Sequence, residues 1–105
     1  MSFFTRRPFK LEHMTPDNRD TVRIVLNAVL ENEEDQAVRK RVSAALKHFE
    51  KGALAKEEAD QVKACLAAAI RTLYKWPENE LAVSLRENSI TMEDIAKVSS
   101  VQLGE

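Results

Sequence analysis

Three side chains of this sequence are of types that could attack a substrate or bind a metal, namely His13, His48 and Cys65. A cysteine becomes a nucleophile when a base such as histidine is held beside it, and thiolate and imidazole are also the usual ligands of zinc. These residues are far apart in the chain, and none belongs to a closely spaced ligand pair. Their spacing therefore predicts a non-enzymatic protein without a metal or cofactor.

Cys65 is the single cysteine, so it cannot form a disulfide within the chain. It lies beside Leu66 and Ala69 on a predicted helix. This position favours a small packed hydrophobic side chain, with a reactive or ligating thiol as the alternative.

A dense acidic cluster lies at residues 31–35 and consists of Glu31, Glu33, Glu34 and Asp35. A calcium loop would need a glycine turn and a different carboxylate spacing. With only two glycines in the chain, a glycine-rich phosphate loop is excluded as well. We interpret the cluster as negative charge at the N-terminal end of the next helix.

Length and composition indicate one helical domain. The chain has 105 residues, of which 44% are hydrophobic and 31% charged, as is ordinary for a globular protein. The scarcity of glycine and proline, together with plentiful alanine, leucine, glutamate and lysine, favours helix over sheet. The 16 basic and 17 acidic residues nearly cancel. The whole protein therefore has no strong attraction to nucleic acid or an anionic membrane.

A cytoplasmic location without membrane contact is expected. The first residues place two phenylalanines before two arginines, which is the wrong order for a signal peptide. No apolar run approaches the roughly 18 residues that a membrane span needs.

The element that organises the rest is a predicted helix over residues 55–76. Large apolar residues recur at helical spacing and make one stripe, with Leu66 in its middle. Ala64, Ala67 and Ala68 form a second face with almost no bulk. A helix with one bulky and one small face can contact neighbours on two sides, which is typical of a central helix.

Two helices precede it. Thr15 is the expected N-cap and Pro16 the first residue of a helix that ends near Asn32, and a second helix covers residues 36–51. The apolar stripes of the two would point about 180° apart on one continuous helix. The phase therefore predicts an antiparallel hairpin with its joint at residues 32–35. Ile24 points away from the first stripe and is a candidate contact residue.

Two short helices are expected after Trp76. Pro77 is predicted as the first residue of a helix reaching Glu87, while Trp76 is either a half-buried plug or an exposed binding residue. Thr91 and Asp94 fit a capping box, Ile90 and Ile95 fit a hydrophobic staple, and the helix that follows covers residues 92–98.

Residues 90–101 also resemble the first helix and turn of a DNA-binding helix-turn-helix, with Ile95, Ala96 and Val101 at fitting positions. Ser100 replaces the usual turn glycine, and too few residues follow for a recognition helix. We interpret the stretch as a capped helix.

The predicted architecture is all-α. It consists of a three-helix core (the hairpin plus the central helix), two short C-terminal helices and an extended N-terminal arm. The arm covers residues 1–14, the domain 15–98 and a C-terminal tail 99–105. The aromatic side chains of the arm need burial, either on the chain's own bundle near Trp76 or in a groove on a second chain, and we favour the second.

These features predict a small protein that acts by binding another protein or itself, as an adaptor, inhibitor or regulatory subunit, and that forms a homodimer. The candidate protein-binding residues are Phe3, Phe4, Arg6, Arg7, Phe9, Ile24, Ala64, Ala68 and Trp76. The alternative is a nucleic-acid-associated regulator that uses the arm and the basic face of residues 36–51. That face comprises Arg39, Lys40, Lys47 and Lys51.

Overall fold

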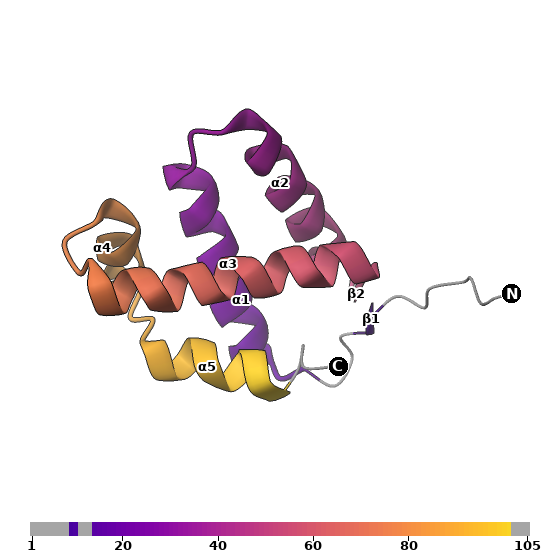
Figure 1. Cartoon of the computed structure of the whole chain (residues 1–105). Helices are drawn as coiled ribbons and strands as arrows, with labels where there is room; N and C mark the ends of the chain where they lie inside the picture. The colour runs from indigo at the N-terminus through magenta and orange to yellow at the C-terminus, as the bar shows by residue number, and fades with distance from the viewer. Residues whose placement is uncertain (1–8, 11–13, 102–105) are drawn as a thin grey trace, which may run out of the picture.

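A computed structural model describes residues 9–10 and 14–101 (Figure 1). The described residues form helices α1 (Pro16–Asn32), α2 (Gln36–Glu50), α3 (Lys56–Lys75), α4 (Glu80–Glu87) and α5 (Met92–Val101), and strands β1 (Phe9–Lys10) and β2 (Ala53–Leu54). The predicted all-α class is confirmed.

Helix α3 is the centre of the fold, as its two-faced sequence predicted. It contacts each of the other four helices and lies across α1 in Figure 1. The side chain of Leu66 is fully buried, as are Val25 of α1 and Val42 of α2. Helix α5 lies along α3 and adds Ile95 to the same core, and α4 adds Leu85, so both short helices extend the expected three-helix core.

The predicted break between the first two helices is confirmed. Helix α1 begins after the N-cap Thr15, whose Oγ1 accepts a hydrogen bond from the Asn18 N–H at 3.2 Å, and it ends at Asn32. Asp35 caps α2 by accepting from the Ala37 N–H at 2.9 Å. The three-residue connection returns the chain alongside α1, so both apolar stripes face one core.

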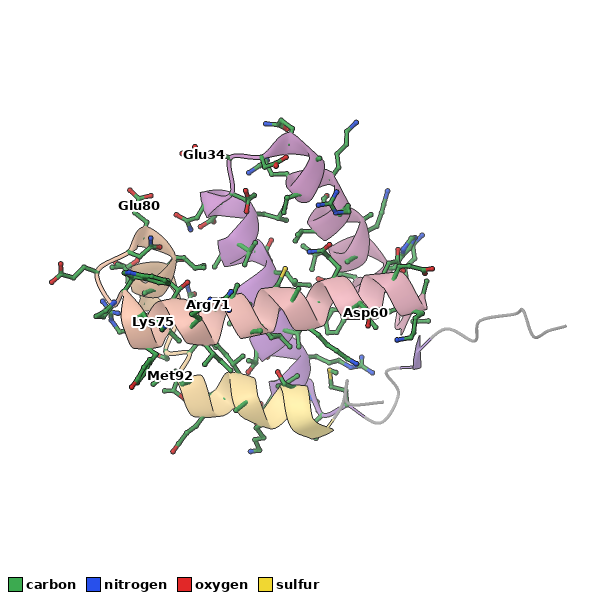
Figure 2. The ribbon with its side chains drawn as sticks, in the orientation of Figure 1. Glu34, Asp60, Arg71, Lys75, Glu80 and Met92 are labelled. Carbon is green, nitrogen blue, oxygen red and sulfur yellow. The ribbon has the colours of Figure 1, made fainter. Side chains whose placement is uncertain are left out.

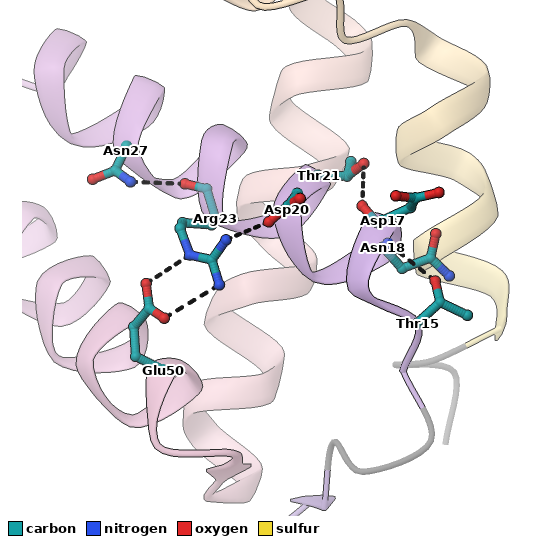
Figure 3. A network of polar contacts seen from close by, with 8 residues as sticks. All are labelled: Thr15, Asp17, Asn18, Asp20, Thr21, Arg23, Asn27 and Glu50. Carbon is teal, nitrogen blue, oxygen red and sulfur yellow. Dashed lines mark hydrogen bonds and ion pairs between the residues drawn. The ribbon is translucent and has the colours of Figure 1, made fainter.

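Arg23 joins α1 to the far end of α2. Its Nε donates to Glu50 Oε2 at 2.8 Å and its Nη2 to Oε1 at 3.3 Å, while Nη1 contacts Asp20 at 2.5 Å (Figure 3). The hydrogen bonds with Glu50, and then those with Asp20, raise the pKa of Arg23 above its ordinary value. His48 of α2 similarly pairs with Glu58 of α3. These contacts fix the C-terminal end of α2 relative to α1 and α3.

The segment before α1 is not wholly an arm. Phe9 pairs with Leu54 and Lys10 with Ala53 in a short antiparallel ladder, and the Met14 side chain is buried in the core. Gly52, at a φ of 96°, turns the chain out of α2 into an extended strand whose backbone groups need partners. The predicted boundary at residue 15 is therefore wrong. The domain includes these earlier residues.

The position of Phe9 disagrees with one of the two burial sites expected for the N-terminal arm, namely the chain's own bundle near Trp76. The ladder is at the N-terminal end of α3, whereas Trp76 is at the other end, so this part of the chain does not pack near Trp76. Four other candidates, Phe3, Phe4, Arg6 and Arg7, are outside the described residues.

The C-terminal helices differ from expectation at their ends. Asn79, not Pro77, precedes the first turn of α4, because its side chain caps the helix by accepting from the Leu81 N–H at 2.8 Å. The capping box of α5 is confirmed, with Thr91 N–H to Asp94 at 3.0 Å and Asp94 N–H to Thr91 at 3.1 Å.

Helix α5 then continues to Val101, so the predicted tail from Ser99 begins too early. Ser99 stays helical and donates its hydroxyl to the Ile95 carbonyl at 3.0 Å. No turn interrupts the helix at Ser100, where a helix-turn-helix would need one.

Candidate functional site

The small face of α3 lies in an open groove of about 340 Å³. We call this hollow the α3 groove. Its floor is formed by Gln61, Ala64, Cys65, Ala68 and Thr72 of α3. Its walls come from the end of α1, the start of α2 and the start of α4, and consist of Val29, Asn32, Glu33, Val38, Asn79 and Leu81.

The groove follows from the spacing of small residues. Ala64, Ala68 and Thr72 succeed one another at intervals of four, so they form one row along the helix. A side chain that ends at Cβ cannot fill the space between the α1–α2 connection and α4. Ala64 is exposed and Ala68 half-buried, so the expected second contact of α3 is not made by a helix of the described chain on this face.

Cys65 lies at the floor of the groove and is only 5% exposed. Burial raises the pKa of its thiol, and the negative charge of Glu33 raises it further, while a hydrogen bond from Gln61 acts in the opposite direction. The thiol is therefore protonated at neutral pH and behaves as an apolar group. The interpretation of Cys65 as a packed side chain is confirmed.

The charge around the groove is acidic at one end. Of the residues that line it, Glu33 alone is charged, and Glu34 follows in the exposed connection. Figure 2 shows Glu34 and Glu80 above α3, on the side of the α1–α2 connection, whereas Met92 lies below it. Arg71 and Lys75 are exposed further along α3. The Arg39 guanidinium lies at the Glu33 carbonyl, but Glu31, Glu33, Glu34 and Asp35 leave this end of the groove with net negative charge.

Trp76 is the C-cap residue of α3 and is 54% exposed. It borders a second hollow together with Asn79, which also lines the α3 groove, so the two hollows share one wall residue. This exposure favours the interpretation as a binding residue over the half-buried plug. Tyr74, which is 73% exposed, was missed, although an aromatic residue outside the apolar stripe could have indicated it.

Ile24 is only partly available as a contact residue. It is half-buried, packs against the core and borders a small hollow shared with Ser84 of α4 and the C-cap residue Asn88. The helical periodicity correctly placed Ile24 away from the apolar stripe of α1, but α4 packs on that side of α1. Docking of a partner on Ile24 stays a prediction.

The basic face of α2 is only partly available. Lys40, Lys47 and Lys51 are exposed. Arg39 instead turns toward the end of α1, where its guanidinium donates to the carbonyls of Leu30 and Glu33. Because these last-turn carbonyls have no partner within α1, Arg39 acts as their cap rather than as a free cation.

Neither a metal cluster nor a membrane span is found in the part of the chain that the structure describes. Residues 9–10 and 14–101 contain no group of three His, Cys, Asp or Glu side chains that could hold a metal ion. None of the described helices is long and apolar enough to cross a membrane.

No protein-family model matches this chain, and no curated protein or solved structure matches it either. We therefore infer a function from the geometry of the α3 groove and its surroundings.

Proposed function

We propose that this is a small non-enzymatic protein that binds a segment of another protein chain in the α3 groove. The observation that carries the proposal is an apolar hollow floored by Ala64 and Ala68, which shares Asn79 with a second hollow bordered by the exposed Trp76. Tryptophan is among the residues that contribute most to binding energy at protein interfaces.

The floor suits a peptide backbone. Alanines at intervals of four let a partner helix or extended segment approach α3 closely, and Val29, Val38 and Leu81 supply apolar walls. Burying apolar area in such a hollow contributes about 25 cal/mol per Å² before the costs of association are subtracted.

The charges set the chemistry of the partner. Glu33 lines one end of the groove and Glu34 follows it. A segment with aromatic or aliphatic side chains and a neighbouring pair of arginines or lysines would match both features. Such complementarity chiefly determines specificity and the rate of association.

Selection from a displayed library of random peptides tests this proposal, with the immobilised protein as bait. Selected peptides should combine apolar anchors with basic residues. Ala68→Arg should weaken their binding at least about tenfold, because it fills the floor of the groove. Ala96→Arg, at an exposed alanine of α5, is the matched control. If no peptide is selected, or if binding survives Ala68→Arg, the groove is not the binding site.

One observation supports a second candidate function, nucleic-acid binding. Lys40, Lys47 and Lys51 are exposed and fall within about 40° of one another on the helical wheel, so they make a row about 16 Å long on α2. Phosphate binding by such a row would weaken steeply with salt, whereas apolar docking would not. Titrating a fluorescent DNA duplex at several salt concentrations, with Lys47→Glu as the variant, distinguishes the two.

A further inference from the structure

We infer that the α3 groove receives residues 1–8 of a second copy of this chain. This inference rests on the proposed function, since it names the partner of that same groove. The occupant is chosen by charge complementarity and by the reach of the N-terminal segment from strand β1.

Residues 1–8 have the chemistry that the groove selects. Phe3 and Phe4 are two adjacent aromatic anchors, and Arg6 and Arg7 follow within three residues. The first ten residues contain no aspartate or glutamate. With the phenylalanines over the alanine floor, the arginines can meet Glu33 and its neighbour Glu34, the acidic end of the groove.

The segment of the same copy is poorly placed to make these contacts. Strand β1 pairs with β2 at the C-terminal end of α2, whereas Glu33 precedes the N-terminal end of α2. Helix α2 has 15 residues and is therefore about 22 Å long. Arg6 is three residues before Phe9, so its backbone extends at most about 11 Å from the ladder. This stretch of backbone covers only about half the length of α2, which favours an ion pair between Arg6 of one copy and Glu33 of the other.

Exchange of the segments between two copies gives a closed dimer. Each copy would place its first eight residues in the groove of the other, so both grooves are filled and no further copy can add. The ladder of β1 with β2 fixes the base of each segment on its own domain. It thereby limits the orientations that the segment must lose on binding, which favours the exchange.

Sedimentation of the full-length protein over a range of concentrations tests the inference. The wild-type chain should form a dimer, and Phe3→Ala with Phe4→Ala should weaken it at least about tenfold. Ala68→Arg should do the same from the groove side, while Ala96→Arg should not. Thermal midpoints of the variants, measured on dilute protein, check that each remains folded.

A charge exchange tests which residues meet. Arg6→Glu with Arg7→Glu should weaken the dimer, and so should Glu33→Arg with Glu34→Arg. Mixing the two double variants should restore a heterodimer, because opposite charges again face each other across the interface. A mixture that remains monomeric would overturn the placement of the arginines.

A peptide titration separates failure of this inference from failure of the proposed function. A synthetic peptide of residues 1–10 is added to the full-length Phe3→Ala, Phe4→Ala variant, and the fluorescence of Trp76, the single tryptophan, reports binding. Binding that Ala68→Arg abolishes supports the inference. If library peptides bind in the groove but this peptide does not, the inference is wrong and the proposed function stands. A wild-type protein that stays monomeric at all concentrations overturns the exchange.

Discussion

Two faces of the same helix contrast in what they do. The face of α3 that carries Leu66 is fully buried against α1, α2 and α5, whereas the face of Ala64 and Ala68 is left open as a groove. Both faces are apolar, and they differ in side-chain volume. Bulky side chains at helical spacing draw neighbouring helices onto one side, while alanines on the other side leave room for a backbone that is not part of the described chain.

This difference separates stability from recognition. Substitutions on the bulky face should change the free energy of unfolding and have little direct effect on binding. Substitutions in the groove should do the reverse. The following substitutions test that separation, from the largest expected effect on stability to the smallest.

Leu66→Ala should produce the largest loss of stability. Leu66 is fully buried in the middle of the stripe, so truncation removes packed methyl groups and leaves a cavity. We expect a loss of about 2–5 kcal/mol in the free energy of unfolding, measured by urea denaturation. A denaturation midpoint equal to that of the wild type would contradict the central position of this face.

Asp35→Ala should cost less, about 0.5–2 kcal/mol, because it removes the cap of α2. The Asp35 carboxylate accepts hydrogen bonds from the backbone of Ala37 at 2.9 Å and of Val38 at 3.4 Å. The hairpin between α1 and α2 forms one wall of the groove, so this substitution also tests whether that wall depends on the cap. Asp35→Asn keeps an acceptor and should lose only a small part of the stability.

The features that the sequence predicted well are local. Residues within one helical turn of each other specify each of these features. They are the N-cap Thr15, the joint after Asn32 and the capping box of Thr91 and Asp94. The phase of the apolar stripes needs only the helical period, and it correctly assigned residues such as Val42 to the core.

The features that the sequence did not predict depend on residues far apart in the chain. The ladder of Phe9 with Leu54 and the burial of Met14 exist only because the end of α2 and the start of α3 are near the N-terminal segment in space. Arg39 was assigned to a basic surface, but the orientation of the hairpin brings it to the carbonyl of Leu30. No local pattern encodes these contacts.

The candidate site was predicted in part for the same reason. Ala64, Ala68 and Trp76 were named from residue type and spacing. The two alanines line one groove, and Trp76 borders a second hollow that shares Asn79 with it. The depth of the groove depends on how α1, α2 and α4 meet α3, which the sequence of α3 alone does not specify. The acidic end contributed by Glu33 was interpreted only as helix-end charge.

A pH dependence should arise at the edge between the two faces, where Glu58 of α3 pairs with His48. Burial acts to raise the pKa of Glu58, but hydrogen bonds from the Ala55 N–H, at 2.9 Å, and from His48 outweigh it, so the pKa lies below the ordinary 4.5. The unfolded chain therefore binds a proton at a higher pH than the folded chain does. The stabilisation of the folded chain by the ionised Glu58 carboxylate is present above pH 4.5 and is lost as the pH falls through the lowered pKa of Glu58.

Glu58→Gln tests this dependence, because glutamine can still accept from the Ala55 N–H but does not titrate. Between about pH 5 and pH 3 the wild type should lose up to about 1 kcal/mol more stability than the variant does. The exposed Glu93→Gln controls for the loss of one carboxylate. Parallel stability curves for the wild type and Glu58→Gln would show that the pair does not contribute.

Ala68→Leu should have the smallest effect on stability and is the sharpest comparison of the two faces. Its neighbour Ala69 is fully buried, so Ala69→Leu should overpack the core and cost about 1–3 kcal/mol. At Ala68 the same added bulk enters an open groove, and alanine and leucine have similar helix propensities, so the change should stay within about 0.5 kcal/mol. The bulk should nevertheless obstruct the groove and weaken the dimer in sedimentation. If Ala68→Leu destabilises the monomer as much as Ala69→Leu does, the small face is a packed contact, and the groove cannot be the docking surface.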